Sequence, residues 1–424
     1  MMDARLLSER LAPEIAGELR SDAASREMYS RDASLYARTP LAVLRAGAAT
    51  DLEAAVEACR LTGVPLTMRG AGTSLAGQTV GRGLVVDTSA LNEIRIDPAG
   101  RRARVGPGAV LGDLNRAAAA HGLIFGADVA TADRATLGGM IANNSAGMRS
   151  VVHGLTATHV RALTVVMADG RRVRLTAGSA APSALEDARH LAVRAEPASL
   201  LRRVSGYDLG ALSEADWPRL LAGTEGTLAV TLEAELDLVP LPAARGIALL
   251  GYDSVEEAAA AVPALLRADP SAIEMIDEHL LDPRNRPPAD VDLLDFAEGR
   301  PGAMLVVEHS GTAAEVADAL RAIPGARIVT DVTAQEHIWA ARRLGIGRAQ
   351  AAVTDRAAGR DPRPVPFIED PAVPPDRLGD FVREARAMLR EEQVPAIWYG
   401  HASVGCLHIR PMMDLSRPAE VRQM

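Results

Sequence analysis

The sequence predicts an α+β protein with two main domains. Its 424 residues are 48% hydrophobic, and a chain of this length usually divides, because single domains run to about 100 to 200 residues. The pattern of apolar residues changes near Pro240, where a strand-like run ends in the sequence PLP. Strands joined by turns precede this point, and strands alternate with helices after it. We therefore place a domain boundary after residue 241.

The first domain is predicted to cover residues 39–241, after an N-terminal helical extension at residues 1–38. A helix is expected at residues 50–63, because Thr50 and Glu53 are spaced as a capping box and Gly63 can end the helix. Cys59 lies on its apolar face and is expected in the core. Strands are expected at residues 65–69 and 84–87, and the sequence ADG at 168–170 predicts a hairpin. Much of the strand pairing should therefore be antiparallel.

The second domain, residues 242–424, shows a regular order of strands and helices. Strands are expected at residues 247–251, 272–276, 303–308 and near 328. Helices are expected to begin at Ser254, at about Thr312 and at Thr333. Glu257 and Glu336, three residues after the first and the last of these, support those two starts. This order is typical of a ferredoxin-like domain.

The composition excludes several classes of function. A net charge of -9 and 3% aromatic residues disfavour nucleic-acid binding. All 46 basic residues are Arg, so neither a lysine Schiff base nor a P-loop can form, and anionic groups must be held by Arg, hydroxyls or backbone N–H groups. Two cysteines are too few for an iron–sulfur cluster. No apolar run approaches the roughly 20 residues of a membrane span, and a cytoplasmic protein is expected.

The sequence RGAGTSLAGQT at residues 69–79 is a candidate phosphate-binding loop. Its glycines permit positive φ, so that consecutive N–H groups can converge on an anion, and Thr73 and Ser74 add hydroxyl donors. A Rossmann loop would open a long helix. Here Leu75 takes the third glycine position, and the next strand starts about ten residues further on. A surface loop rich in turn residues remains the alternative interpretation.

Two further clusters of glycine and polar residues favour the binding interpretation. They are ATLGGMIANNSAGMRSVVHG at residues 135–154 and GTEGTLAV at residues 223–230. Three such loops in one domain indicate a single extended ligand.

Together these motifs resemble the FAD-linked oxidase family, the flavoproteins of the vanillyl-alcohol-oxidase type, and within it the D-2-hydroxyacid dehydrogenases. The resemblance runs from about Tyr29 to His408. It implies a two-subdomain FAD-binding domain followed by a ferredoxin-like substrate (cap) domain. By resemblance, the first loop binds the FAD pyrophosphate, the second lines the dinucleotide, and Glu225 lies near the adenine half. The implied cofactor-binding residues are Arg69, Gly70, Ala71, Gly72, Thr73, Ser74, Gly77, Gln78, Thr136, Gly139, Asn143, Ser145, Gly147 and Glu225.

The sequence YGHASVGCLHIRP at residues 399–411 is the candidate reaction centre. A turn at residues 403–405 could bring His401 and His408 to one site, where neutral imidazoles are good ligands for zinc or manganese. Two hydrogen-bonded strand histidines are the alternative. The resemblance favours a metal, because H-x6-H at this place is similar to the metal-binding motif of the 2-hydroxyacid dehydrogenases. Cys406 is expected to be a small packed strand residue. The HASVGCLHIRP form resembles the branch in which flavin and iron–sulfur halves are fused.

Two arginines are candidates for binding substrate carboxylates. Arg342 follows Trp339 in the pattern W-x-x-R, and by resemblance this Arg holds the substrate carboxylate, for which a bidentate guanidinium is suited. For Arg343 a solvated basic helix face stays equally open. Arg410 is expected on the same side of its strand as His408, where it could clamp a second carboxylate. The candidate catalytic residues are thus Arg342, His401, His408 and Arg410.

The resemblance implies an FAD-dependent dehydrogenase that oxidises a D-2-hydroxyacid, such as D-lactate or D-2-hydroxyglutarate, by hydride transfer to flavin N5. Electrons would then leave to an iron–sulfur partner or a quinone, which could place the protein peripherally at the inner membrane; a homodimer is left open. In the family, a Glu-His-Gly segment after the second histidine supplies a third metal ligand and a proton acceptor, and the present sequence ends at Met424 before it. A truncated FAD-binding subunit without turnover and a flavin oxidase that uses oxygen are therefore the alternatives.

Overall fold

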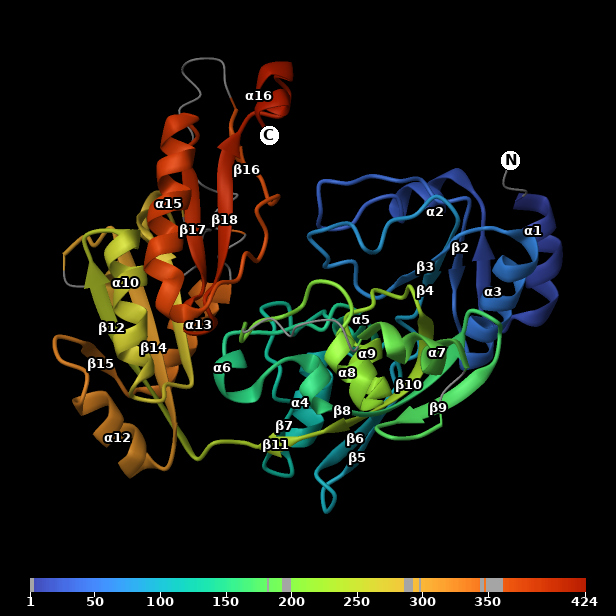
Figure 1. The fold of residues 1–424 in the computed structure, drawn as a ribbon, viewed down its shortest axis with the longest axis horizontal. Helices are drawn as coiled ribbons and strands as arrows, with labels where there is room; N and C mark the ends of the chain where they lie inside the picture. Colours follow the sequence, from blue (N-terminus) through green and yellow to red (C-terminus); the bar gives the residue numbers. More distant parts are fainter. Residues whose placement is uncertain are drawn as a thin grey trace. The chain divides into compact units, whose positions relative to one another are not determined.

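The computed structural model describes residues 4–180, 183–192, 200–285, 293–296, 299–343, 347 and 361–424. These residues form two compact units. The first comprises Met1–Ala146, His153–Ala198 and Val204–Leu241, and the second comprises Gly147–Val152, Ser199–Arg203 and Pro242–Met424. Two short segments that precede residue 241 in the sequence therefore belong to the second unit. The two units are coloured along the chain in Figure 1, and each is described by itself.

A small mixed sheet lies at the start of the first unit. Its strand order is β1-β2-β4-β3, with β1 (Glu18–Arg20) antiparallel to β2 (Ala42–Arg45), and with β2 and β3 (Leu66–Arg69) both parallel to β4 (Leu84–Asp87). Helices α1 (Ala4–Leu11) and α3 (Ala49–Thr62) pack in the same core, which includes Cys59 as predicted. Because β1 pairs with β2, part of the predicted N-terminal extension is built into this sheet.

The start of α3 differs from the sequence prediction. The helix begins at Ala49, one residue early, and Asp51 takes the role that was expected of Glu53. The buried carboxylate of Asp51 accepts hydrogen bonds from the backbone N–H groups of Ala16, Gly17 and Gly47, at 2.8, 2.9 and 2.7 Å. The predicted Thr50–Glu53 capping box is therefore wrong, because an acidic side chain was needed where the chain from residues 16–17 and the helix start meet.

The second sheet of the first unit is antiparallel throughout, as the hairpin and the alternating strands predicted. Its order is β5-β6-β10-β8-β9. The strands are β5 (Ile94–Asp97), β6 (Arg102–Val105), β10 (Ala229–Asp237), β8 (Val160–Met167) and β9 (Arg172–Thr176). The turn between β8 and β9 contains the predicted ADG sequence, and Gly170 has φ +86. A two-stranded pair, β7 (Leu123–Ile124) with β11 (Val239–Pro240), accompanies this sheet.

Helices cover one face of this five-stranded sheet and share its core. They are α4 (Leu111–Ala119), α5 (Leu137–Ala142), α7 (Ser183–Ala192), α8 (Leu209–Glu214) and α9 (Trp217–Leu221). Apolar side chains on the other face, such as Val166, Val230 and Leu232, join the core that contains α3. The first unit thus has two sheets with α3 packed between them. The short segments α2 (Ala23–Met28) and η2 (Thr156–His159) lie in its connections, and α6 (Ser150–His153) lies where the chain passes from one unit to the other.

The second unit contains one seven-stranded antiparallel sheet, in the order β15-β12-β14-β13-β17-β18-β16. Its first four strands are β12 (Ala244–Tyr252), β13 (Ala272–Asp277), β14 (Ala303–Gly311) and β15 (Arg327–Val329). Helix α10 (Val255–Leu266) connects β12 to β13, and α12 (Ala313–Arg321) connects β14 to β15. These elements follow one another along the chain as βαββαβ, and their four strands lie in the sheet in the order β15-β12-β14-β13. This is the ferredoxin-like arrangement, so the predicted ferredoxin-like domain is confirmed. The strands β17 (Ala396–His401), β18 (Cys406–Met413) and β16 (Arg363–Pro364) extend it beyond β13.

The helix starts predicted for α10 and α12 are confirmed. Ser254 caps α10 and Thr312 caps α12, where Glu315 completes a capping box. Helix α13 (Val332–Arg343) was expected to start with Thr333 and Glu336, and this prediction is wrong. Asp331 provides the cap instead, since its carboxylate accepts a hydrogen bond from Ala334 N at 2.8 Å. A short carboxylate just before the helix accepts from the free N–H group of Ala334 in the first turn, so the helix begins at Val332, two residues earlier than a cap at Thr333 would place it.

Helices cover both faces of the seven-stranded sheet (Figure 1). Helices α10, α12 and α15 (Leu378–Glu391) share a core with one face. Helix α13 and the short α11 (Glu278–Leu281) pack with Ile276, Val306 and Tyr399 on the other face. The remaining short segments of the second unit are η3 (Pro283–Asn285), η4 (Leu293–Phe296), η6 (Pro375–Arg377), η7 (Ala402–Val404) and α16 (Pro418–Gln423), and the first unit also contains η1 (Ala12–Glu14). Within the described part of the chain, no helix is long and apolar enough to cross a bilayer.

The α13 face of the sheet carries buried carboxylates. Glu308 on β14 is fully buried, and its two carboxylate oxygens accept hydrogen bonds from Nε and Nη2 of Arg149, each at 2.6 Å. It also accepts a hydrogen bond from Trp339 Nε1 at 2.8 Å. Arg149 follows Gly147 in the second glycine-rich segment, and this bidentate pair fixes residues 147–152 to the second unit. Such pairs are strong because both hydrogen bonds are charge-assisted.

Candidate functional site

The three glycine-rich loops of the first unit converge. Gly70 in the first loop lies against Thr136, which caps α5 in the second loop. Gln78 Nε2 reaches Glu225 Oε1 in the third loop at 3.4 Å. The third loop is also joined to the end of α5, because Glu225 N donates to the carbonyl of Ala142 at 2.9 Å. Residues that lie far apart in the sequence therefore form one surface, as a single extended ligand would require.

The geometry of the first loop fits a phosphate group. No helix follows β3 between residues 70 and 83, so the Rossmann interpretation is excluded in the described structure. Gly72 has φ +67 and Gly77 has φ +82, values that favour glycine. A Cβ atom on Gly70 would overlap Thr136 Oγ1. The Gln78 Oε1 atom is buried and has no partner among the described residues; as an acceptor it suits an N–H or O–H donor of a bound ligand and not a phosphate oxygen.

Other predicted cofactor residues hold the loops in place. Arg69 lies over the ring of Tyr29, 5.3 Å from its centroid, and its Nη1 reaches the carbonyl of Thr79 at 3.4 Å. The Ser74 hydroxyl accepts from the backbone of Ala76 and Gln78, at 3.3 and 3.4 Å. The remaining predicted residues of the first loop, Ala71 and Thr73, are exposed and half-buried respectively.

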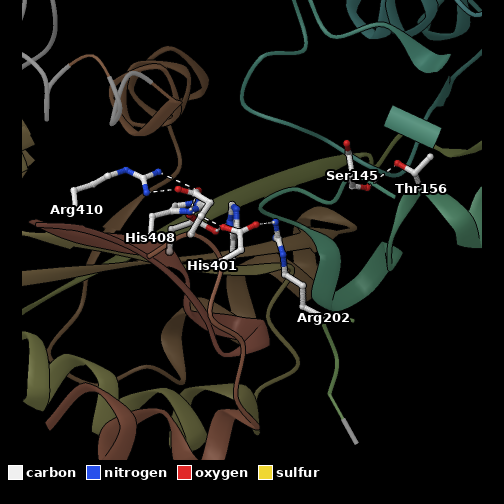
Figure 2. Close-up of polar contacts among 9 residues, drawn as sticks. Ser145, Thr156, Arg202, His401, His408 and Arg410 are labelled. Carbon is white, nitrogen blue, oxygen red and sulfur yellow. Dashed lines mark hydrogen bonds and ion pairs between the residues drawn. The ribbon is translucent and has the colours of Figure 1, made fainter. Parts of the chain in front are cut away.

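The second loop is partly helical, which the sequence analysis did not foresee. Thr136 accepts from Gly139 N at 3.4 Å, and Asn143 ends α5. The carbonyl of Ser145 accepts from Thr156 Oγ1 at 2.6 Å, a bond drawn in Figure 2. Gly147 belongs to the segment that is grouped with the second unit.

The two predicted histidines of the second unit are brought together by a tight hairpin. The segment η7 and Gly405, with φ +67, turn the chain between β17 and β18. Tyr399 is paired with His408, and His401 with Cys406, so all four side chains point to the same face of the sheet. The imidazole centroids of His401 and His408 are 5.2 Å apart. The predicted turn at residues 403–405 is thus confirmed.

Each imidazole is held through Nδ1 by a carboxylate. His401 Nδ1 lies 2.7 Å from Glu274 Oε1, and Glu274, on β13, is fully buried. His408 Nδ1 lies 2.7 Å from Asp370 Oδ1 and 3.1 Å from Glu369 Oε1. In the described structure these contacts use only Nδ1, so the Nε2 atoms remain available as ligands or hydrogen-bond partners.

These surroundings shift the two imidazoles in opposite directions. Burial lowers the pKa of His401 to about 4, although the Glu274 carboxylate opposes the shift. Burial would also lower the pKa of His408, but Asp370 and Glu369 outweigh it and raise that pKa above its usual value. For Asp370, burial favours the neutral form, yet His408 and Arg202 hold its pKa well below the usual value. At neutral pH the first ring is therefore neutral, and the second is balanced by two carboxylates.

Three buried arginines surround this pair of histidines (Figure 2 labels two of them). Arg342, at the end of α13, forms an ion pair with Glu274 and lies 5.2 Å from the ring centroid of Tyr399. Arg410, on β18, is bound through both terminal nitrogens by Glu369, as the predicted orientation beside His408 allows. Arg202 donates from Nη2 to Asp370 Oδ2 at 2.8 Å. Arg343, by contrast, is exposed.

Several polar atoms of this cluster are buried without a hydrogen-bond partner among the described residues. They are Nε and Nη2 of Arg342, Nε and Nη1 of Arg202, Oε2 of Glu274, Oδ1 of Asp370 and the hydroxyls of Tyr399 and Ser403. Arg342 Nη2 contacts Glu274 Oε2 as an ion pair, and Asp370 Oδ1 contacts His408 Nδ1 in the same way. Leaving a buried donor unpaired costs about 1–3 kcal/mol, and most buried polar groups in proteins avoid this cost. Since the charged atoms that remain are guanidinium donors, Nε of Arg342 and Nε and Nη1 of Arg202, the cluster fits an anionic ligand.

A second group of side chains could hold a metal ion. Glu369, Asp370 and His408 place one ligand atom each within 4.8 Å of one another. This set contains only one of the two predicted metal ligands, and His401 is not part of it. Both carboxylates already bind a guanidinium, Glu369 that of Arg410 and Asp370 that of Arg202, which competes with a cation for the same oxygens.

Four residues of this cluster were missed by the sequence analysis: Arg202, Glu274, Glu369 and Asp370. Glu274 had a local signal, because a charged residue in the middle of the apolar strand sequence AIEMID must be paired when that strand is buried. The acidic pair Glu369 and Asp370 lies in a proline-rich segment without a periodic pattern. Arg202 is one of two adjacent arginines, and nothing local distinguishes it from Arg203.

Comparisons with known proteins agree with this architecture. Residues 40–176 match the model of the FAD binding domain, and residues 241–424 match that of the C-terminal domain of FAD linked oxidases. The chain is 30% identical to a D-2-hydroxyglutarate dehydrogenase of Pantoea ananatis, an alignment that covers 96% of this chain and 44% of that protein. It therefore spans less than half the length of this relative.

Shorter relatives are covered more completely. The glycolate oxidase subunit GlcD of Bacillus subtilis is 28% identical, with 95% of this chain and 79% of that protein aligned. A D-lactate dehydrogenase of Archaeoglobus fulgidus is 26% identical, with 82% and 70% aligned. Among solved structures, an alkyldihydroxyacetonephosphate synthase superposes with a TM-score of 0.70 at 15% identity, over 97% of this chain and 76% of that one. This last likeness concerns the fold alone.

Proposed function

The chain belongs to the FAD-linked oxidases, with an FAD-binding domain followed by the C-terminal domain of that family, and we propose that it oxidises a 2-hydroxyacid to the 2-oxoacid. The observation that carries this proposal is the buried cluster of arginines around His401 and His408. Its unpaired donors suit a carboxylate, and its imidazoles suit a neighbouring hydroxyl group. D-lactate, D-2-hydroxyglutarate and glycolate are the substrates to test, because they correspond to the relatives described above.

Arg342 is the residue that we propose for the substrate carboxylate. Its Nη2 forms the ion pair with Glu274, whereas its Nε is buried and lacks a partner in the described structure, so Nε is the donor that can bind a carboxylate. Glu274 and the Tyr399 ring keep the guanidinium in place and leave Nε available. FAD, when bound, supplies the acceptor for the hydride that leaves C2 of the substrate.

The imidazoles are proposed to act at the substrate hydroxyl. Their Nε2 atoms would hold a divalent metal, zinc or manganese, which lowers the pKa of a bound hydroxyl group. The donor set fits such an ion, since imidazoles oriented by carboxylates are common metal ligands; His401 is already neutral, and His408 would release its proton when the metal binds. The charges also fit: Arg202, Arg342 and Arg410 balance Glu274, Glu369 and Asp370, so a divalent cation would offset the charge of an anionic substrate. The electrons would leave to an iron–sulfur partner or a quinone.

Anaerobic mixing of the FAD-loaded protein with each hydroxyacid tests this function. We expect bleaching of the flavin absorbance by at least one D-2-hydroxyacid, faster with added zinc or manganese, and not by its L-enantiomer. The Arg342→Gln variant should raise the substrate concentration for half-maximal rate by about tenfold or more, because a charge-assisted pair is lost. Arg321→Gln, at an exposed site of the same unit, is the matched control. Absence of bleaching by all three acids, with either metal present, would overturn the proposal.

A further inference from the structure

Arg202 enters the cluster from a segment remote in sequence from the strands that build it. Residues Ser199–Arg203 are grouped with the second unit although they lie between stretches of the first. The side chain of Arg202 is only 6% exposed. A fully charged group is rarely buried to this extent unless it is paired or bound to a ligand.

The pairing of Arg202 is incomplete. Its Nη2 donates to Asp370 Oδ2 at 2.8 Å, whereas Nε and Nη1 have no hydrogen-bond partner among the described residues. Asp370 in turn contacts His408 Nδ1 at 2.7 Å. The guanidinium is therefore oriented by one carboxylate beside the histidine pair, with two further buried donors unused.

The other two arginines of the cluster differ in this respect. Arg410 gives both terminal nitrogens to Glu369 and lies 5.5 Å from the ring centroid of Tyr399, so it is already saturated by a residue of the chain. Arg342 retains one unused donor, Nε, because its Nη2 pairs with Glu274. Among the described residues of the cluster, Arg202 is therefore the arginine with two unused donors, Nε and Nη1.

We propose that Arg202 binds a second carboxylate of the substrate and so selects a dicarboxylic 2-hydroxyacid over a monocarboxylic one. The assignment rests on the proposed function, in which Arg342 holds the carboxylate next to the reacting carbon. The sequence alone pointed to Arg410 for the second carboxylate, but Glu369 occupies both terminal nitrogens of Arg410. We therefore assign the distal carboxylate to Arg202, whose Nε and Nη1 are unused. A monocarboxylic acid would leave the Arg202 donors unpaired, and a site that is built to pair a group discriminates against ligands that lack it.

The test compares two pairs of ligands on the FAD-loaded full chain. D-2-hydroxyglutarate and D-lactate are compared as substrates through flavin reduction, and glutarate and butyrate are compared as unreactive ligands by calorimetry. In Arg202→Gln we expect the dissociation constant of glutarate and the KM of D-2-hydroxyglutarate to rise about tenfold to hundredfold. The values for butyrate and D-lactate should change less than twofold. Arg342→Gln should weaken all four ligands.

Two further variants separate binding from structure. Arg202→Lys keeps a positive charge beside Asp370 and should fold like the parent protein, yet it lacks the fixed planar donors and should show an intermediate loss for glutarate alone. Arg321→Gln controls for the loss of one positive charge. An equal loss for mono- and dicarboxylates in Arg202→Gln, or no loss for either, would overturn the proposal, as would a parent protein that does not bind glutarate.

The calorimetric measurement also separates this inference from the proposed function. If no hydroxyacid reduces the flavin, the proposed reaction fails, while the binding of glutarate to the parent protein and to Arg202→Gln still decides whether Arg202 receives a second carboxylate.

Discussion

At the scale of single residues, the site depends on carboxylates that orient other groups. Glu274 joins His401 to Arg342, and Asp370 joins His408 to Arg202. In each case a carboxylate lies between an imidazole and a guanidinium; that of Glu274 is fully buried and that of Asp370 is partly buried. The carboxylate fixes which imidazole nitrogen is available to a ligand, since a contact at Nδ1 leaves Nε2 for other partners.

Replacing Glu274 should therefore damage both stability and activity. In Glu274→Gln, Arg342 loses its buried counter-ion, and we expect the free energy of unfolding to fall by about 3–5 kcal/mol. Turnover of the responsive hydroxyacid should fall by about 10- to 100-fold, because His401 is less firmly oriented. Urea unfolding and flavin reduction measure the two effects. Glu256→Gln provides the control, since Glu256, like Glu274, contacts two basic side chains but at a partly exposed site, where the cost should stay below about 1 kcal/mol. Equal effects of the two changes would contradict this account.

The two histidines should contribute to the pH dependence of stability with opposite signs. The pKa of His401 is lowered to about 4, so between pH 6.5 and 4 the unfolded state binds a proton that the folded state does not. Stability should therefore fall as the pH falls through this window, by up to about 3 kcal/mol from this ring. The raised pKa of His408 means that its contribution is present below the unfolded value and is lost as the pH rises through the folded one.

Urea unfolding of the metal-free protein between pH 4 and 8 measures these contributions. His401→Gln should flatten the loss of stability between pH 6.5 and 4, whereas His408→Gln should leave that window unchanged and remove instead a loss of stability that occurs as the pH rises above 6.5. Curves of the same slope for both variants would show that the two rings are not held as described.

At the scale of elements, the site is made by places where the chain reverses or approaches itself closely. The hairpin of β17 and β18 aligns Tyr399, His401 and His408 on one face. In the first unit, the loop after β3 lies against the start of α5, and Gly70 is the point of closest approach. Local sequence predicted the turn and the loop, because glycine marks both.

The contact between Gly70 and Thr136 should control flavin binding. In Gly70→Ala the new Cβ would overlap Thr136 Oγ1, so the first loop must move away from the second. We expect the dissociation constant of FAD to rise at least tenfold, measured by quenching of flavin fluorescence on binding. Gly210→Ala is the matched control, because Gly210 lies in α8 of the same unit and its nearest contact is a side-chain oxygen at 3.2 Å. An unchanged FAD affinity in Gly70→Ala would separate this loop from the flavin site.

At the scale of the whole molecule, the chain forms two compact units with separate cores. The loops that resemble an FAD site belong mainly to the first unit, and the histidine cluster belongs to the second. A ligand stabilises the part of a protein that binds it, by about 2.7 kcal/mol at a concentration one hundred times its dissociation constant.

Calorimetry should therefore resolve the two units. FAD at one hundred times its dissociation constant should raise the midpoint of the transition of the first unit by about 5–11 °C, and the other transition should move less. Trp217 lies in the first unit, and Trp339 and Trp398 lie in the second. Tryptophan fluorescence of the Trp217→Phe variant during thermal unfolding therefore reports on the second unit and assigns the two transitions. A shift of the second transition alone would contradict the placement of the flavin loops.

The sequence by itself determined the secondary structure of most of the sheets, the ferredoxin-like order of the second unit, the glycine loops and the paired histidines. These features follow from local rules: alternating apolar residues, glycine at turns, and caps at helix starts. The same local rules gave the wrong start for two helices, α3 and α13, where Asp51 and Asp331 take the place of the predicted capping residues. Only the tertiary structure decided which charges meet. Arg202, Glu274 and Asp370 come from three remote segments, and a buried charge finds its partner through the packing of those segments, which no local pattern records.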